Sequence, residues 1–257
     1  MRRAAEAGVT VLGLTDHDTI GGCAAVQRAC QAEHITFVPG IEITSVVEGA
    51  DVHVLGYFID IESANLLAFL DAQRADRATR VRRIVERLAH EGIDLDGEEI
   101  LKPGRDDPSK SPGRPWVARA LVASGHASTS DEAFARWLGR GRPAYVPRTG
   151  SRPEEVFDRI HAAGGVASLA HPALIGHDEW LPGFSSAGLD ALEAYHFDHD
   201  ASTTGRYLEV ARRLALAVSG GSDFHGDESH GARHPGAVCL PPEAFDRLAR
   251  VKVDRGY

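Results

Sequence analysis

The sequence predicts an α/β fold of the (β/α)-barrel type that is interrupted by a helical insertion. Short apolar segments alternate with amphipathic helical segments near both ends of the chain, and histidine or carboxylate side chains close several of these apolar segments. A (β/α) barrel places its active site at the carboxyl ends of its parallel strands. We therefore expect residues 1–60 to form the first part of the barrel, 61–145 the insertion and 146–257 the second part.

The first part of the barrel is predicted to alternate between helix and strand. Its elements are a helix over 2–7, a strand over 9–14, a helix over 22–32, a strand over 35–38 and a strand over 51–59. Pro39 and Gly40 follow the 35–38 strand, so Glu42 is expected just beyond a strand end. Because side chains alternate along a strand, His53, Leu55 and Tyr57 should share one face.

The insertion is predicted to be mainly helical. Apolar residues recur at helical spacing over 62–90, and Gly92 follows as a stop signal. A polar loop with proline and glycine over 101–113 then precedes two further helices, over 115–123 and 131–138. The arginine-rich face of the 62–90 helix is expected to be solvated rather than to bind RNA.

Strand and helix alternate again after residue 150. Ser151 and Glu154 have the spacing of a capping box, which predicts a helix start, and Gly164 and Gly165 end that helix. Strands are predicted over 166–170, 189–195 and 214–219, with a helix over 204–213. His171 and Asp223 then follow strand ends, as the active-site residues of a barrel do.

Composition excludes several classes of function. Acidic residues outnumber basic ones by 37 to 28, and the resulting net charge of −9 disfavours nonspecific binding to long nucleic acid or to anionic membranes. The three cysteines form neither a C-x-x-C pair nor an even disulfide framework. Neither a membrane-spanning segment nor a signal peptide is visible, so a cytoplasmic location is expected.

Histidine and carboxylate residues form the pattern that most strongly indicates chemistry. Imidazole and carboxylate ligands together suit zinc, manganese or iron, and a glutamate can bridge two ions. Each of these residues could alone be a solvated or packing side chain, but their recurrence at predicted strand ends favours a single metal cluster. The expected metal ligands are His17, Glu42, His53, His171, Asp223 and His225.

Other polar residues are weaker candidates. Asp16 and Asp18 flank His17 and are expected to orient ligand histidines or to lie at the rim. His196 and His199 follow the 189–195 strand, where they could face the substrate.

The ordered motifs of this chain resemble those of the PHP (polymerase and histidinol phosphatase) superfamily, and within it the TrpH-like 3',5'-nucleoside bisphosphate phosphatases. The matching segments are Leu14–Asp18, Gly40–Glu42, His53–Gly56, Gly113–Pro115, Ala163–Gly165, Ala170–Pro172 and Gly220–His225. The resemblance implies a distorted TIM-like (β/α)7 barrel with a helical insertion over the site, and up to three divalent ions (Mn, Zn or Fe). It also implies catalytic roles for Asp223, His225 and His171, and substrate binding by Arg114.

The chain departs from this family at its beginning. Members begin with a strand that carries His-x-His and a further ligand, whereas this sequence opens in the expected first helix, so the barrel is expected to lack its first strand. Of the three metals that the resemblance implies, only the central one then keeps all its ligands, which are Glu42, His53 and His171. Two explanations are open. The gene start was assigned to an internal codon, that of Met1, and the natural protein is longer, or the protein is naturally shortened and binds fewer metal ions.

A second departure is Trp116, which stands where the family usually has a histidine. Arg114 remains suited to bidentate phosphate binding near a helix start. Trp116 could stack on a nucleotide base, or it could pack the insertion against the barrel.

The leading functional prediction is a metal-dependent phosphoesterase. Neither a Gly-x-Ser-x-Gly elbow nor a Walker loop is present, so attack by metal-activated water is expected rather than a covalent nucleophile. The resemblance implies a small phosphorylated substrate, a nucleoside 3',5'-bisphosphate or the end of a short RNA. A histidinol-phosphate-type phosphatase is a second reading, and a catalytically silent metal- or nucleotide-binding protein is an alternative from a different class.

Overall fold

The computed structural model describes residues 1–107, 109–226 and 234–254. The chain divides into two compact units. Met1–Leu67 and Ser151–Tyr257 make up the first, here called the sheet unit, and Ala68–Gly150 make up the second, here called the helical unit.

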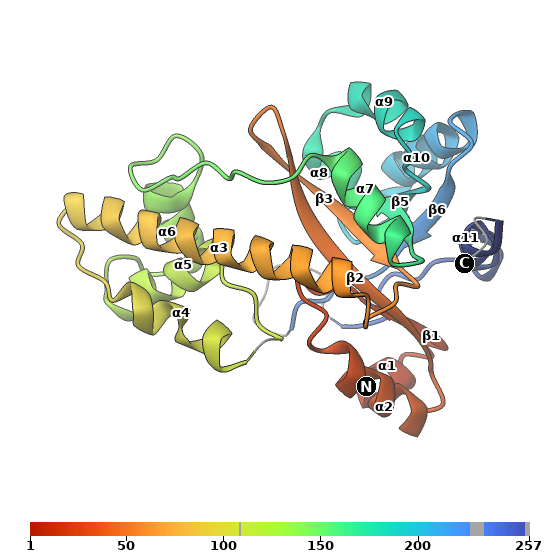
Figure 1. Ribbon diagram of the computed structural model, residues 1–257, viewed down its shortest axis with the longest axis horizontal. Helices are drawn as coiled ribbons and strands as arrows, with labels where there is room; N and C mark the ends of the chain where they lie inside the picture. Colours follow the sequence, from red (N-terminus) through yellow and green to blue (C-terminus); the bar gives the residue numbers. More distant parts are fainter. Residues whose placement is uncertain (108, 227–233, 255–257) are drawn as a thin grey trace. The chain divides into compact units, whose positions relative to one another are not determined.

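A mixed β-sheet forms the centre of the sheet unit (Figure 1). Among the described residues, the sheet has six strands, in the order β1-β2-β3-β4-β5-β6. β1 pairs in parallel with β2, β3 runs antiparallel to both β2 and β4, and β4, β5 and β6 are parallel. The strands are β1 (Val11–Leu14), β2 (Thr36–Val47), β3 (Ala50–Tyr57), β4 (Val166–Leu169), β5 (Ala191–Tyr195) and β6 (Ala217–Gly220).

The antiparallel direction of β3 corrects the expectation of purely parallel strands. Only Glu48 and Gly49 separate β2 from β3, and both have positive φ angles, of 50° and 78°. Two such residues form the tight hairpin turn that joins antiparallel strands, whereas a parallel pair needs a long crossover.

β2 is also much longer than expected, because Pro39 and Gly40 do not end it. Gly40 lies inside the strand, where a Cβ atom would come within 2.8 Å of the Leu14 carbonyl oxygen and 2.9 Å of the Gly56 carbonyl oxygen. The glycine therefore allows neighbouring strands to approach closely instead of forming a turn. As a result, Glu42 lies in the middle of β2 and not beyond a strand end.

α7 and α10 pack on one apolar face of the sheet, whereas Leu248 of α11 packs against Val166 and Ala191 on the opposite face. α7 packs against β2, β3 and β4, while α10 packs against β5 and β6. Ile160 of α7 lies against Gly56 of β3, and the sheet residues on this face include Ile41 and Val54. The helical segments are α1 (Arg2–Glu6), α2 (Cys23–Ala32), α7 (Pro153–Ala162), α8 (Pro172–Ile175), η2 (Asp178–Trp180), α9 (Leu181–Ser186), α10 (Ala201–Arg213) and α11 (Pro242–Asp254).

Some of these helices differ from expectation. α7 begins after Arg152 without a side-chain cap, so the predicted Ser151 capping box is wrong. The sequence pattern does not predict α8, η2 or α9, because these segments are too short to show a helical period. α11 was also missed, although Phe245, Leu248 and Val251 recur there at helical spacing. No helix in the described part of the chain is long and apolar enough to cross a membrane.

The helical unit has its own apolar core, which includes Ile84, Leu88, Leu121 and Leu138. α4 was expected to be partly loop, but Asp96 accepts hydrogen bonds from the backbone of Glu98 and Glu99 and starts a helix that tolerates Pro103. The helices are α3 (Ala64–His90), which begins in the sheet unit, α4 (Gly97–Asp106), α5 (Arg114–Ala123), α6 (Ser130–Ala133) and the π-helical η1 (Phe134–Leu138).

Several arginines of α3 bind backbone carbonyls of the helical unit. Arg74 donates to the carbonyl oxygens of Gly104 and Lys110, at 3.0 and 3.1 Å. Arg80 Nε donates to the Val146 carbonyl oxygen at 2.9 Å. The expectation of a purely solvated arginine face is therefore wrong for these positions, because the guanidinium groups hold the loops of their own unit.

We expect Arg80→Ala to lower the free energy of unfolding of the helical unit by about 1.5–3 kcal/mol, since a hydrogen bond from a charged donor is lost in a buried position. The exposed neighbour Arg83 gives a matched control, and Arg83→Ala should change this free energy by less than about 0.5 kcal/mol. Urea unfolding followed by tryptophan fluorescence measures both variants. Equal losses in the two variants would contradict the role of Arg80.

Candidate metal centre

The face of the sheet opposite α7 and α10 carries polar side chains in addition to the apolar residues that contact α11. In the register of β2 and β3, Glu42 lies opposite Leu55 and Thr44 lies opposite His53, so these four side chains point to the same side. On the other half of the sheet, Ser168 Oγ and Ser219 Oγ lie 2.7 Å apart. Alternation along the strands therefore separates an apolar face under helices from a polar face that can hold a site.

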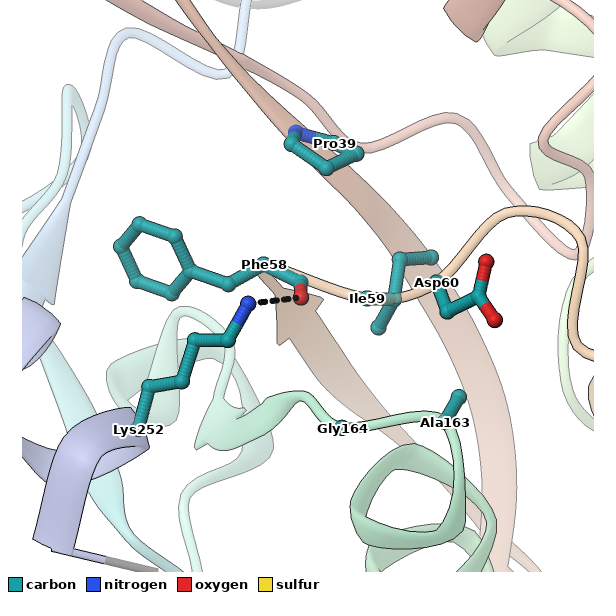
Figure 2. A pocket seen from close by; sticks show the side chains of 7 residues that line it. All are labelled: Pro39, Phe58, Ile59, Asp60, Ala163, Gly164 and Lys252. Carbon is teal, nitrogen blue, oxygen red and sulfur yellow. Dashed lines mark hydrogen bonds between the residues drawn. The ribbon is translucent and has the colours of Figure 1, made fainter. Parts of the chain in front are cut away.

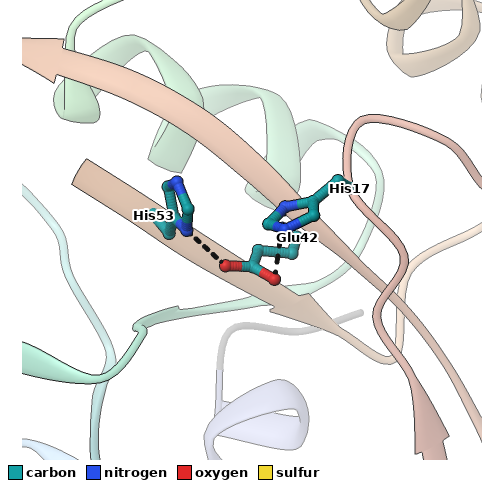
Figure 3. A group of neighbouring side chains, drawn as sticks. All are labelled: His17, Glu42 and His53. Carbon is teal, nitrogen blue, oxygen red and sulfur yellow. Dashed lines mark ion pairs between the residues drawn. The ribbon is translucent and has the colours of Figure 1, made fainter. Parts of the chain in front are cut away.

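Glu42 is the centre of this polar face, and its carboxylate is 3% exposed. Figure 3 shows His53 and His17 on its two oxygens. His53 Nδ1 lies 2.6 Å from Oε1, and His17 Nδ1 lies 3.4 Å from Oε2. His171 Nε2 lies 3.3 Å from Oε1. One carboxylate thus faces His53 and His171 with one oxygen and His17 with the other.

The loop that carries His17 is fixed to β2 by its flanking aspartates. The backbone N–H of Asp18 donates to the Glu42 carbonyl oxygen at 2.8 Å, and the N–H of Glu42 donates to the Asp16 carbonyl oxygen at 3.0 Å. The buried Asp18 side chain accepts the Thr44 N–H at 3.0 Å. These contacts fix the backbone of the loop that carries His17. Orientation of a ligand imidazole by the carboxylate of Asp16 or Asp18 stays a prediction.

Asp223 and His225 follow β6 and lie beside the same cluster. The His225 and His17 ring centroids are 5.7 Å apart. His225 Nδ1 donates to the Asp223 carbonyl oxygen at 2.9 Å, and Asp223 Oδ2 lies 3.4 Å from His196 Nε2. The structure therefore brings all six expected metal ligands into one region of the sheet unit.

His196 and His199 are held by protein atoms. His196 has a fully buried side chain, and its Nδ1 accepts the Asp198 N–H, which leaves Nε2 to donate to Asp223. His199 Nδ1 donates to the Ala194 carbonyl oxygen at 2.9 Å. Substrate binding by these two histidines stays a prediction.

Arg114 and Trp116 belong to the helical unit. The Arg114 guanidinium lies over the rings of Phe134 and Tyr145, at 5.6 and 6.0 Å from their centroids. The Trp116 ring packs on Gly104 of α4, where a Cβ atom would come within 2.8 Å of it. Trp116 thus packs within its own unit, and phosphate binding by Arg114 stays a prediction.

The charges of the cluster shift the ionisation of its members. Burial opposes ionisation of Glu42, but the adjacent His17, His53 and His171 hold its pKa well below the usual range. Burial lowers the pKa of His171, yet its hydrogen bond and attraction to Glu42 outweigh this effect and raise the pKa to about 9. Burial also disfavours the charged form of Asp223, but the hydrogen bond from His196 and the attraction of His225 lower its pKa.

These residues fit a divalent cation. The ligand atoms of His17, Glu42 and His53 all lie within 4.8 Å of one another, and imidazole with carboxylate is a donor set that binds zinc, manganese and iron. His171 presents Nε2 to the same carboxylate, 3.3 Å from Glu42 Oε1, and so adds a further donor atom to the cluster. The cluster can therefore bind one or more divalent ions.

A cavity of about 300 Å³ lies at the other end of β4 from His171 and contains none of the predicted site residues (Figure 2). In this cavity Lys252 Nζ donates to the Phe58 carbonyl oxygen at 3.4 Å. The lining residues are Pro39, Phe58, Ile59, Asp60, Ala163, Gly164 and Lys252.

Sequence reasoning missed Glu193, which lies beside the site in β5. Its side chain accepts the His171 N–H at 2.7 Å, and burial raises its pKa to about 7. An acid within the otherwise apolar segment Ala191–Tyr195 was the available signal, because a buried carboxyl group needs a partner.

Comparisons with known proteins identify the class of this chain. No protein-family model matches it. It is 33% identical over 234 residues to the 5'-3' exoribonuclease Rnm of Escherichia coli, covering 88% of this chain and 78% of that protein. It is 31% identical over 245 residues to the 3',5'-nucleoside bisphosphate phosphatase of Chromobacterium violaceum, covering 93% of this chain and 85% of that protein.

A solved structure gives the same result. A structure assigned to a metal-dependent phosphoesterase from Bifidobacterium adolescentis matches with a TM-score of 0.86 and 29% identity, covering 100% of this chain and 89% of that chain. Fold, cluster and relatives together define a hydrolase of the metal-dependent phosphoesterase class. Within that class the chain belongs to the PHP family, which confirms the resemblance that its motifs indicated.

Without metal, we expect the free energy of unfolding to fall by about 3 kcal/mol as the pH rises from about 6.5 to about 9. The pKa of His171 is raised in the folded chain, so its contribution to stability is complete below the unfolded pKa and disappears as the pH rises through the folded pKa. Urea unfolding with chelator present measures this loss. The His171→Gln variant should lose less free energy of unfolding over the same pH range. Some loss should remain in it, because the raised pKa of Glu193 acts in the same direction. Parallel plots of unfolding free energy against pH for the two proteins would contradict the role of His171.

Proposed function

We propose that this chain hydrolyses a phosphate ester of a small nucleotide by metal-activated water. The observation that carries the proposal is the Glu42 carboxylate, whose oxygens face His17 on one side and His53 and His171 on the other. A carboxylate in this position can bridge two cations. The relatives that act on nucleotides support the substrate class.

In this proposal Glu42, His53 and His171 hold the central ion. Glu42 with Asp223, and His17 with His225, contribute to further ions, up to the three (Mn, Zn or Fe) expected in the family. Bound divalent ions supply Lewis acidity, which activates water and offsets negative charge on the phosphoryl oxygens. The sheet would then correspond to part of a seven-stranded PHP barrel, with 61–145 as its insertion.

We assign the catalytic roles to Asp223, His225 and His171. The lowered pKa of Asp223 keeps its carboxylate anionic at neutral pH, as a cation ligand or an acceptor of the water proton must be. The hydrogen bond from His225 Nδ1 to the Asp223 backbone leaves Nε2 as the atom that can face an ion or substrate. Because its pKa is raised, His171 is protonated at neutral pH. It must lose the proton on its own Nε2 before this nitrogen can bind an ion.

Substrate binding is assigned to Arg114, Trp116, His196 and His199. The guanidinium of Arg114 can bind a phosphate group through two nitrogens. The net charge of −9 supports a small substrate over a long nucleic acid, because phosphate attraction must then come from a local site. Rnm-like relatives are named as 5'-3' exoribonucleases, which favours short RNA ends as a second substrate.

We expect the purified chain to release inorganic phosphate from adenosine 3',5'-bisphosphate when manganese is present and to stop when chelator is added. Asp223→Ala removes an anionic ligand and should lower kcat/KM by at least about 100-fold, the scale of losing an essential catalytic electrostatic contact. Phosphate release against time, with and without manganese, measures both effects.

The control is Asp190→Asn, which alters a buried carboxylate that binds His161 and the Ala167 N–H away from the metal ligands. This variant should keep turnover as long as it stays folded. Turnover of histidinol phosphate or of 5'-phosphorylated short RNA in preference to the bisphosphate would reassign the substrate. Manganese binding without any turnover would favour the silent binding protein and contradict the proposed activity.

A further inference from the structure

Glu193 is a buried carboxyl group that none of the proposed metal or substrate roles uses. It lies in the middle of β5, on the same face of the sheet as Ser219 of β6, and is 5% exposed. Taking a carboxyl group out of water costs free energy unless hydrogen bonds replace those of the solvent. Its position beside the cluster therefore calls for a physical reason.

The hydrogen bond of Glu193 reaches the backbone of a proposed metal ligand. Glu193 Oε2 accepts the N–H of His171 at 2.7 Å, at the short end of the range for N–H···O hydrogen bonds. β4 ends at Leu169, so the chain is leaving the sheet at His171 and its N–H has no ladder partner there. The side chain of Glu193 thus replaces the backbone hydrogen bond that the His171 N–H would make if β4 continued.

The backbone of His171 is in an unusual conformation. Its φ and ψ angles are 26° and 59°, in the left-handed region, where a residue with a Cβ atom costs of order 1–2 kcal/mol. Pro172 follows and disfavours the right-handed helical alternative for His171. Backbone hydrogen bonds fix the chain before and after the His171 N–H. The Ala170 N–H donates to the His53 carbonyl oxygen, and the Leu174 N–H donates to the His171 carbonyl oxygen.

This conformation directs the imidazole of His171 toward Glu42, with Nε2 at 3.3 Å from Oε1. A small rotation of the peptide before His171 would move the ring, because the Cα–Cβ direction follows the backbone. The Glu193 bond holds the N–H at this point, between the end of the strand and the first turn of α8.

We propose that Glu193 is a positioning residue, which fixes the strained backbone of His171 so that its imidazole meets Glu42 and a metal ion. The proposal deepens the proposed function and rests on it. The role depends on where the acceptor oxygen lies and not on the charge of the carboxylate. Glu193 acts through the main chain of its partner, in contrast to the common arrangement in which a carboxylate bonds to the second imidazole nitrogen.

Three substitutions separate position from charge. Glu193→Gln keeps an acceptor oxygen at the same reach without charge, and its cobalt affinity should stay close to that of the unchanged chain. Glu193→Asp keeps the charge but withdraws the acceptor by one methylene group, and Glu193→Leu removes the acceptor. Both should raise the cobalt dissociation constant by roughly 10–100-fold, the usual effect of losing an outer-shell partner.

The measurements are cobalt titration of the chelator-treated protein, the visible absorption bands of bound cobalt, and circular dichroism for folding. The bands should shift in Glu193→Asp and stay in place in Glu193→Gln, which a general loss of stability would not produce. Asp190→Leu is the matched control: it removes another buried acceptor, which binds the Ala167 N–H at 2.9 Å, and it should leave the cobalt spectrum unchanged in the folded protein.

Specific results would overturn the inference. Unchanged affinity and spectrum in Glu193→Asp would show that the bond to His171 has no positioning effect. Equal losses in Glu193→Gln and Glu193→Asp, with one ion fewer bound, would make Glu193 a ligand instead. An unchanged chain that binds no cobalt would overturn the proposed function together with this inference, whereas cobalt binding without turnover would overturn the proposed activity alone.

Discussion

The buried charge of Glu42 is the constraint on which the site depends. A carboxylate that is 3% exposed in the middle of a strand would be costly without compensation. His17, His53 and His171 supply that compensation, and each comes from a different segment of the chain. The fold must therefore bring a loop after β1, the antiparallel β3 and the end of β4 to one point on β2. Gly40 helps to allow this, because it lets neighbouring backbones approach β2 closely.

The same constraint explains why the two faces of the sheet differ. Helices cover the face that carries Ile41 and Val54, so hydrophobic burial is concentrated there. The opposite face is then free to carry Glu42, Ser168 and Glu193. This division separates stability from chemistry, because residues on alternate positions of one strand serve the core and the site. The polar face is nevertheless well bonded, and its hydrogen bonds fix backbone as well as side chains.

The sequence predicts which histidines and carboxylates lie close together better than it predicts how the strands run. The histidine and carboxylate motifs identified the segments that meet at Glu42, since these residue types have few structural reasons to follow apolar strands. The direction of β3 depends on a two-residue turn at Glu48 and Gly49, and Glu-Gly is a weaker hairpin signal than Asn-Gly. Pro39 and Gly40 resemble a turn, and only the closeness of the adjacent strands shows why a glycine lies inside β2. Glu193 was missed although an acid within an apolar strand is a signal, because nothing in the sequence identifies its partner, the backbone N–H of His171.

The cluster also shows how protons and cations can share the same carboxylate. The pKa of His171 is raised and that of Glu42 is lowered, because each stabilises the charged form of the other. A cation that binds between them must displace the proton on the imidazole, so ion binding and proton release are coupled. The backbone N–H of His171 donates to Glu193 and takes no part in this exchange, so the bond does not require the imidazole to keep its proton, although attraction to Glu193 contributes to the raised pKa of His171. A ligand fixed through its main chain can therefore exchange a proton for a metal ion without losing its position.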